Sequence, residues 1–68
     1  MPYPTAQELL ELYEKINKEE EEDGEPEVEI SPENLEYYTE QTVILFDITT
    51  QQAEVLVCEM IELKAKQS

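Results

Sequence analysis

The sequence predicts a small α+β fold in one domain, residues 1–68. Apolar residues recur at helical spacing near the N-terminus and again between residues 53 and 64. Between these two segments, the run TVILFDI at 42–48 is rich in β-branched and aromatic residues, which is typical of a strand. We therefore expect an N-terminal amphipathic helix, an acidic linker at 19–29, a central hydrophobic strand and a C-terminal helix.

The N-terminal helix carries a start signal and a stop signal. Thr5 can cap it, and Glu8 follows three residues later, which is a capping-box pattern. Gly24 and Pro26 are typical of residues just beyond a helix end. We expect the helix to run from about Ala6 to about Glu22. Its apolar stripe consists of Ala6, Leu9, Leu10, Tyr13 and Ile16.

The middle of the chain predicts a short strand and then a helical turn. In EVEI, Val28 and Ile30 alternate with glutamates, as in a half-buried strand. In SPEN, Ser31 can cap a helical turn, and Pro32 suits its first position. This turn would carry the residues LEYY.

The run at 42–48 is apolar on both faces, and such a strand needs cover on both sides. A chain of 68 residues can hardly provide this cover, and one cysteine and no histidine exclude an intrachain disulfide and the usual zinc sites. Oligomerisation remains, so we expect a homodimer. The candidate interface residues are Val43, Leu45, Phe46 and Ile61.

The last segment has two interpretations. As a helix, Ala53, Leu56, Val57, Met60 and Ile61 form one stripe, with Thr49 and Gln52 as a second capping box. As a strand, it would pair with 42–48 in an antiparallel hairpin, but its alternation is poor and TTQQ lacks a preferred hairpin turn. The helical period favours the first interpretation.

The charge balance limits the partners. Asp and Glu number 18, and the four basic residues are all lysines, which gives a net charge of -14. Direct binding to nucleic acid or to an anionic membrane relies on basic residues, so we expect neither. A field of this sign attracts a basic protein partner. No signal peptide or membrane-length apolar run is present in the sequence, so a cytoplasmic location is expected.

Catalysis has little support in the sequence. There is no histidine for general base chemistry and no glycine-rich phosphate loop, because Gly24 is the only glycine. We expect a non-enzymatic protein without a cofactor.

The acidic stretch does not match a calcium loop. With Gly24 at position 6 of an EF-hand loop, Glu19, Glu21 and Asp23 occupy ligand positions 1, 3 and 5. Position 12, which needs a bidentate glutamate, is then Ile30. We therefore predict no metal site.

The same stretch lies at the negative end of the N-terminal helix, where each exposed anion costs about 0.3–1 kcal/mol. Either this end frays into a linker, or an external basic group compensates the charge. One of the two adjacent tyrosines, Tyr37 or Tyr38, could add a contact for a basic surface. The candidate partner-binding residues are Glu19, Glu20, Glu21, Glu22, Asp23, Glu25, Glu27, Glu29, Tyr37 and Tyr38.

The resulting hypothesis is an acidic protein-binding module that occupies a basic, nucleic-acid-binding surface of a partner, as an inhibitor or nucleic-acid mimic would. One alternative is a structural or accessory subunit that binds through its apolar surface. Another is an antitoxin-like protein that neutralises a basic partner.

Overall fold

The computed structural model describes residues 3–24 and 28–67, and its first helix, α1, spans Ala6–Glu22. The predicted capping box is confirmed: Thr5 Oγ1 accepts a hydrogen bond from the Glu8 N–H at 3.1 Å, and Glu8 Oε1 accepts one from the Thr5 N–H at 3.4 Å. After the cap residue Asp23, Gly24 has a φ of 86°, in the left-handed region that glycine adopts at little cost. Both predicted ends of the helix are therefore confirmed.

The second helix is much longer than the predicted turn. A 3-10 turn, η1, spans Pro32–Asn34 and leads directly into α2, Leu35–Phe46. Pro32 does occupy the first helical position, as predicted, but Ser31 makes no side-chain capping bond. Its Oγ is buried and has no hydrogen-bond partner within the described residues.

The central strand predicted at 42–48 is wrong, and so is the α+β fold class. Residues 42–46 are the last turns of α2, and Asp47 caps them in the left-handed conformation with φ 52°. Residues 3–24 and 28–67 form helices and connections without any strand. The protein is all-helical over the part that the structure describes.

Two threonines explain why the strand prediction failed. The buried side of α2 includes Tyr38, Thr39 and Thr42, which recur at helical spacing. Thr39 Oγ1 donates to the Leu35 carbonyl at 2.7 Å and Thr42 Oγ1 donates to the Tyr38 carbonyl at 2.8 Å, each four residues back. These bonds let a threonine enter a helical core, where β-branching would otherwise favour a strand.

The short strand predicted at 28–30 is also wrong. These residues form an irregular connection between α1 and η1. The predicted alternation is nevertheless present, because Ile30 is buried, Glu29 is exposed and Val28 is half-buried. The backbone of this segment bonds to side chains instead of to another strand: the Asn34 amide, for example, donates to the Glu29 carbonyl at 2.8 Å.

The C-terminal helix, α3, spans Thr50–Lys66 and confirms the helical interpretation of the last segment. Thr49 Oγ1 accepts a hydrogen bond from the Gln52 N–H at 3.2 Å, as a capping residue does. Lys64 and Lys66 lie in the last turn, where the helix dipole favours cations. The antiparallel hairpin alternative is wrong.

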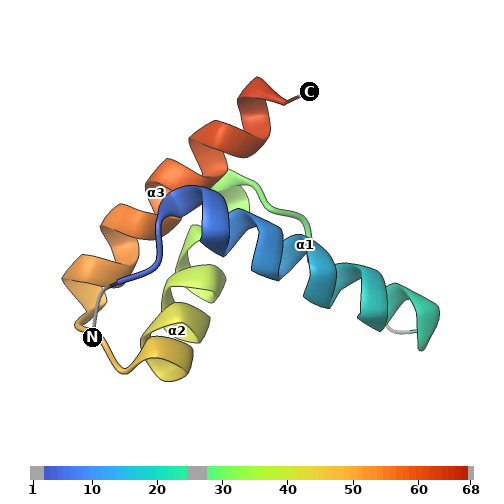
Figure 1. Ribbon diagram of the computed structural model, residues 1–68, viewed down its shortest axis with the longest axis horizontal. Coiled ribbons are helices and arrows are strands. Elements are labelled where there is room, and N and C mark those ends of the chain that lie inside the picture. Colours follow the sequence, from blue (N-terminus) through green and yellow to red (C-terminus); the bar gives the residue numbers. More distant parts are fainter. Residues whose placement is uncertain (1–2, 25–27, 68) are drawn as a thin grey trace.

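The core lies among the three helices, and α3 packs against both of the others (Figure 1). Helix α1 crosses the other two, and its C-terminal end extends beyond them (Figure 1). Most residues of the apolar stripes predicted for α1 and α3 are buried. The buried cluster is Leu9, Leu10, Tyr13, Ile30, Tyr38, Val57, Met60 and Ile61.

Replacement of the α3 cap tests this helix boundary. Thr49→Ala removes the bond to the Gln52 N–H, so we expect the free energy of unfolding to fall by about 1 kcal/mol. Thr50→Ala, the same change one residue inside the helix, should change it by less than about 0.5 kcal/mol. Urea denaturation of the two variants measures the difference, and equal losses would place the helix start elsewhere.

Candidate protein-binding surface

The predicted acidic contact residues lie on the end of α1 that extends beyond the other helices (Figure 1). Residues 19–22 are helical, Asp23 is the cap, and its N–H donates to the Glu19 carbonyl at 3.1 Å. The side chains at 19 and 21–23 are exposed, and Glu20 is half-buried. Glu29 is exposed in the connection, whereas Glu25 and Glu27 lie outside the described residues.

No basic residue lies in the last turn of α1. The ion pair found within the described residues joins Lys64 Nζ of α3 to Glu14 Oε1 in the middle of α1, at 3.8 Å. Both of its side chains are partly exposed, so the pair contributes little to stability. The carboxylates at 19–23 therefore form a local excess of negative charge at the end of the helix dipole that already disfavours it.

A group of side-chain hydrogen bonds holds α1 against α2 and the connection. The Asn17 amide donates to the Val28 carbonyl and to the Tyr38 hydroxyl, both at 3.1 Å. The Tyr38 hydroxyl in turn donates to the same Val28 carbonyl. Because Asn17 and Tyr38 are both buried, these bonds satisfy polar groups that would otherwise be costly in the core.

A second chain of bonds lies next to the first. Tyr13 Oη and Thr42 Oγ1 are 2.8 Å apart. Since the single proton of the Thr42 hydroxyl is donated to the Tyr38 carbonyl, Tyr13 must be the donor of this bond. The rings of Tyr13 and Tyr38 also meet edge to face, with centroids 4.8 Å apart. Together these contacts fix where α1 crosses α2.

The environment of these hydroxyls favours their neutral forms. Burial is the largest cause that raises the pKa of both Tyr13 and Tyr38 above 10.0. The hydrogen bond from Asn17 opposes the rise in the pKa of Tyr38, and the charges of Tyr37, Tyr13 and Glu20 add to it.

The structure separates the two adjacent tyrosines. Tyr38 is 1% exposed and belongs to the core, so its side chain does not face a partner. Tyr37 is 41% exposed, and its ring packs edge to face on Tyr38 with centroids 5.2 Å apart. Tyr37 is therefore the tyrosine that is available for contact.

The predicted oligomer-interface residues do not lie on one free surface. Ile61 belongs to the core, Val43 and Phe46 are half-buried, and Leu45 is 52% exposed. The larger apolar exposures are at Ile44, with 73%, and Val55, with 54%, neither of which was predicted. One of the two reasons for expecting a dimer, a strand apolar on both faces, does not apply to a helix. The other reason, the small size of the chain, is unaffected, and the dimer stays a prediction.

Sequence reasoning also missed Asn17 and Thr42. Asn17 lies four residues after Tyr13 and seven after Leu10, so it continues the apolar stripe of α1. A polar residue at a stripe position needs partners in the core, and this spacing was the available signal. Thr42 begins the run TVILFDI, whose β-branched residues predict a strand and not a buried helical position.

The chain matches no family model, no curated protein and no solved structure. Within 3–24 and 28–67, no group of acidic, cysteine or histidine side chains is arranged to hold a metal ion. Of the helices in this part of the chain, none has the length and apolar character required to cross a membrane.

The burial of Tyr13 and Tyr38 predicts that the protein loses stability at alkaline pH. Because their pKa values are raised in the folded state, the unfolded chain ionises first, and stability falls as the pH rises above about 10. Tyr13→Phe removes one of these groups, so the loss per pH unit should be smaller than in the parent protein, by up to about 1.4 kcal/mol. Urea denaturation at constant ionic strength, repeated at several pH values, measures both slopes. Identical slopes would contradict the burial of Tyr13.

Proposed function

We propose that this chain is a non-enzymatic, acidic protein-binding module that occupies a basic, nucleic-acid-binding surface of a partner protein. The observation that carries the proposal is the acidic end of α1: successive carboxylates at 19–23 at a helix end that extends beyond the other helices (Figure 1). Glutamates spaced along a helix end can present anionic charge to groups that normally meet phosphates.

The cost of this arrangement to the free protein supports an external partner. Each exposed anion in the last turn opposes the helix dipole by about 0.3–1 kcal/mol. Repulsion between neighbouring carboxylates adds to that cost. Lys or Arg side chains of a partner would relieve both effects. Binding would therefore stabilise a helix end that is destabilised in the free protein.

Tyr37 supports the same kind of partner. Its ring is partly exposed and is held against Tyr38, which is bonded to Asn17 of α1. An aromatic face beside carboxylates suits an arginine side chain, through a cation–π contact worth about 0.5–1 kcal/mol at an exposed site.

A second function, that of an accessory subunit bound through apolar surface, is favoured by one observation. Ile44, Leu45 and Val55 are each more than half exposed on α2 and α3. A complex made through these residues would bury apolar area, and salt would hardly weaken it. Salt dependence therefore separates the two functions.

A charge-position experiment tests the proposal. The end variant changes four exposed carboxylates of the acidic end: Glu19→Gln, Glu21→Gln, Glu22→Gln and Asp23→Asn. The control variant removes the same number of charges from exposed positions elsewhere: Glu11→Gln, Glu33→Gln, Glu59→Gln and Glu62→Gln. The immobilised parent chain first captures proteins from a cell extract at low salt, and the recovered proteins are identified.

We expect the parent chain to capture basic proteins whose binding weakens at about 0.15 M salt. The end variant should lose at least about tenfold in affinity for them, since four charge contacts are removed. The same variant should also resist urea better than the parent, because it relieves the dipole conflict. Equal loss of binding in both variants, or capture that salt does not affect, would overturn the proposal.

A further inference from the structure

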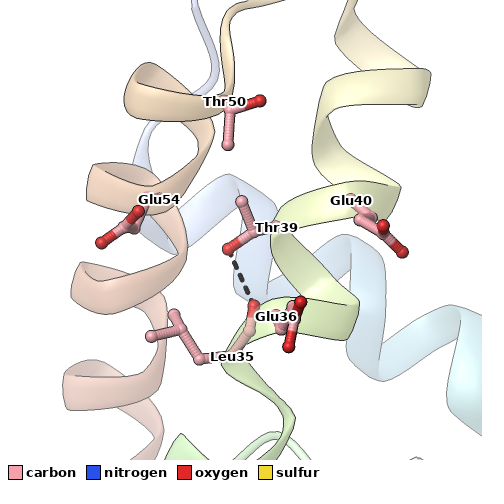
Figure 2. Close-up of a pocket in the computed structure, with 6 residues that line it drawn as sticks. All are labelled: Leu35, Glu36, Thr39, Glu40, Thr50 and Glu54. Carbon is pink, nitrogen blue, oxygen red and sulfur yellow. Dashed lines mark hydrogen bonds between the residues drawn. The ribbon is translucent and has the colours of Figure 1, made fainter.

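The strongest feature outside the acidic end is a shallow groove between α2 and α3 (Figure 2). One part of it has a volume of about 410 Å³, and a neighbouring part, which shares three of its lining residues, has about 380 Å³. The lining comes entirely from these two helices, and α1 passes behind them (Figure 2). The groove residues are Leu35, Glu36, Thr39, Glu40, Val43, Ile44, Thr50 and Glu54.

The centre of the groove offers little polar chemistry. Thr39 lies between the two helices and donates its hydroxyl proton to the Leu35 carbonyl (Figure 2). Leu35 and Val43 are half-buried on α2, and Ile44, at one end, is 73% exposed. A ligand that docks here therefore gains by burying apolar surface more than by new hydrogen bonds.

The rims of the groove are anionic. Glu36 and Glu40 flank it on α2, and Glu54 flanks it on α3 (Figure 2). All three side chains are exposed, and no lysine is among the lining residues. The groove thus combines an apolar centre with negative edges.

Charge decides which occupant fits. A second copy of the chain also carries a net charge of -14 and would bring its own carboxylates toward these rims. A partner helix with one apolar face and flanking Lys or Arg residues matches both features. Helix α2 has 12 residues, so it is about 18 Å long and offers room for about three turns of such a helix.

We propose that the groove between α2 and α3 is a docking site for an amphipathic helix of a basic partner protein. The apolar face of the partner helix lies over Leu35, Val43 and Ile44. Its basic residues pair with Glu36, Glu40 and Glu54. This inference rests on the proposed function in that it takes the partner to be basic. It adds a second contact surface, distinct from the acidic end of α1.

Two synthetic peptides of about 14 residues, equal in composition and rich in Leu and Lys, test the site. In the amphipathic peptide the leucines share one helical face; in the scrambled peptide they are spread around the helix. The full chain, labelled with ¹⁵N, is titrated with each peptide at about 0.15 M salt. The titration measures the affinity of each peptide and identifies the residues whose backbone amide chemical shifts change.

Ile44 and Leu45 provide a matched pair of variants. They are neighbours near the end of α2 and are both more than half exposed, but only Ile44 lines the groove. Ile44→Asn and Leu45→Asn therefore make similar changes to the helix, and circular dichroism checks that both variants fold.

We expect the amphipathic peptide to bind at least about tenfold more tightly than the scrambled one, because it buries apolar side chains. Its shift changes should centre on Leu35, Thr39, Val43 and Thr50. Ile44→Asn should weaken its binding by about tenfold, and Leu45→Asn by less than about twofold.

Three outcomes would overturn the docking site. Equal binding of both peptides, with shift changes confined to 19–24, would leave the proposed function supported but assign it to the acidic end alone. Failure of both peptides to bind would count against the groove and against a basic partner. Shift changes in the groove that depend on protein concentration, without any peptide, would identify a second copy as the occupant.

Discussion

The position of α1 depends on buried polar side chains that satisfy one another. Tyr13 donates to Thr42, and Thr42 donates to the Tyr38 carbonyl. Asn17 bonds to the Tyr38 hydroxyl and shares the Val28 carbonyl with it. A buried group without a partner would cost about 1–3 kcal/mol, which is large beside the marginal stability of a 68-residue chain. A shift of α1 by one turn would break several of these bonds together, whereas apolar contacts alone tolerate small slides.

This arrangement also determines where charge and apolar surface lie. Since the bonds to Asn17 hold the second half of α1 against α2, the residues after Asn17 continue past the other helices (Figure 1). The acidic end therefore extends outward instead of folding back on the core. With α1 on one side of α2 and α3, the groove between those two helices opens on the other side (Figure 2). The two candidate contact surfaces follow from the same crossing.

The sequence was sufficient to predict α1 and α3, because in each of them the capping residues and the apolar period indicate the same helix. It was insufficient for α2, where the apolar run at 42–46 suggested a strand. The helix there depends on tertiary burial of Thr39 and Thr42, whose hydroxyls bond within the helix. Its end also lacks the usual signal, because Asp47 adopts a left-handed conformation that glycine more often supplies. Of the candidate site, the acidic run could be located from composition, but the burial of Tyr38 and the groove depend on how the helices cross.

A double-mutant cycle on Tyr13 and Thr42 tests the central claim that buried hydrogen bonds fix α1 against α2. Thr42→Val leaves the Tyr13 hydroxyl buried without its acceptor, whereas Tyr13→Phe removes that hydroxyl. We predict that the double variant loses less stability than the sum of the two single losses, by about 1 kcal/mol or more. Strictly additive losses in urea denaturation would show that the two hydroxyls do not interact, and would contradict the account.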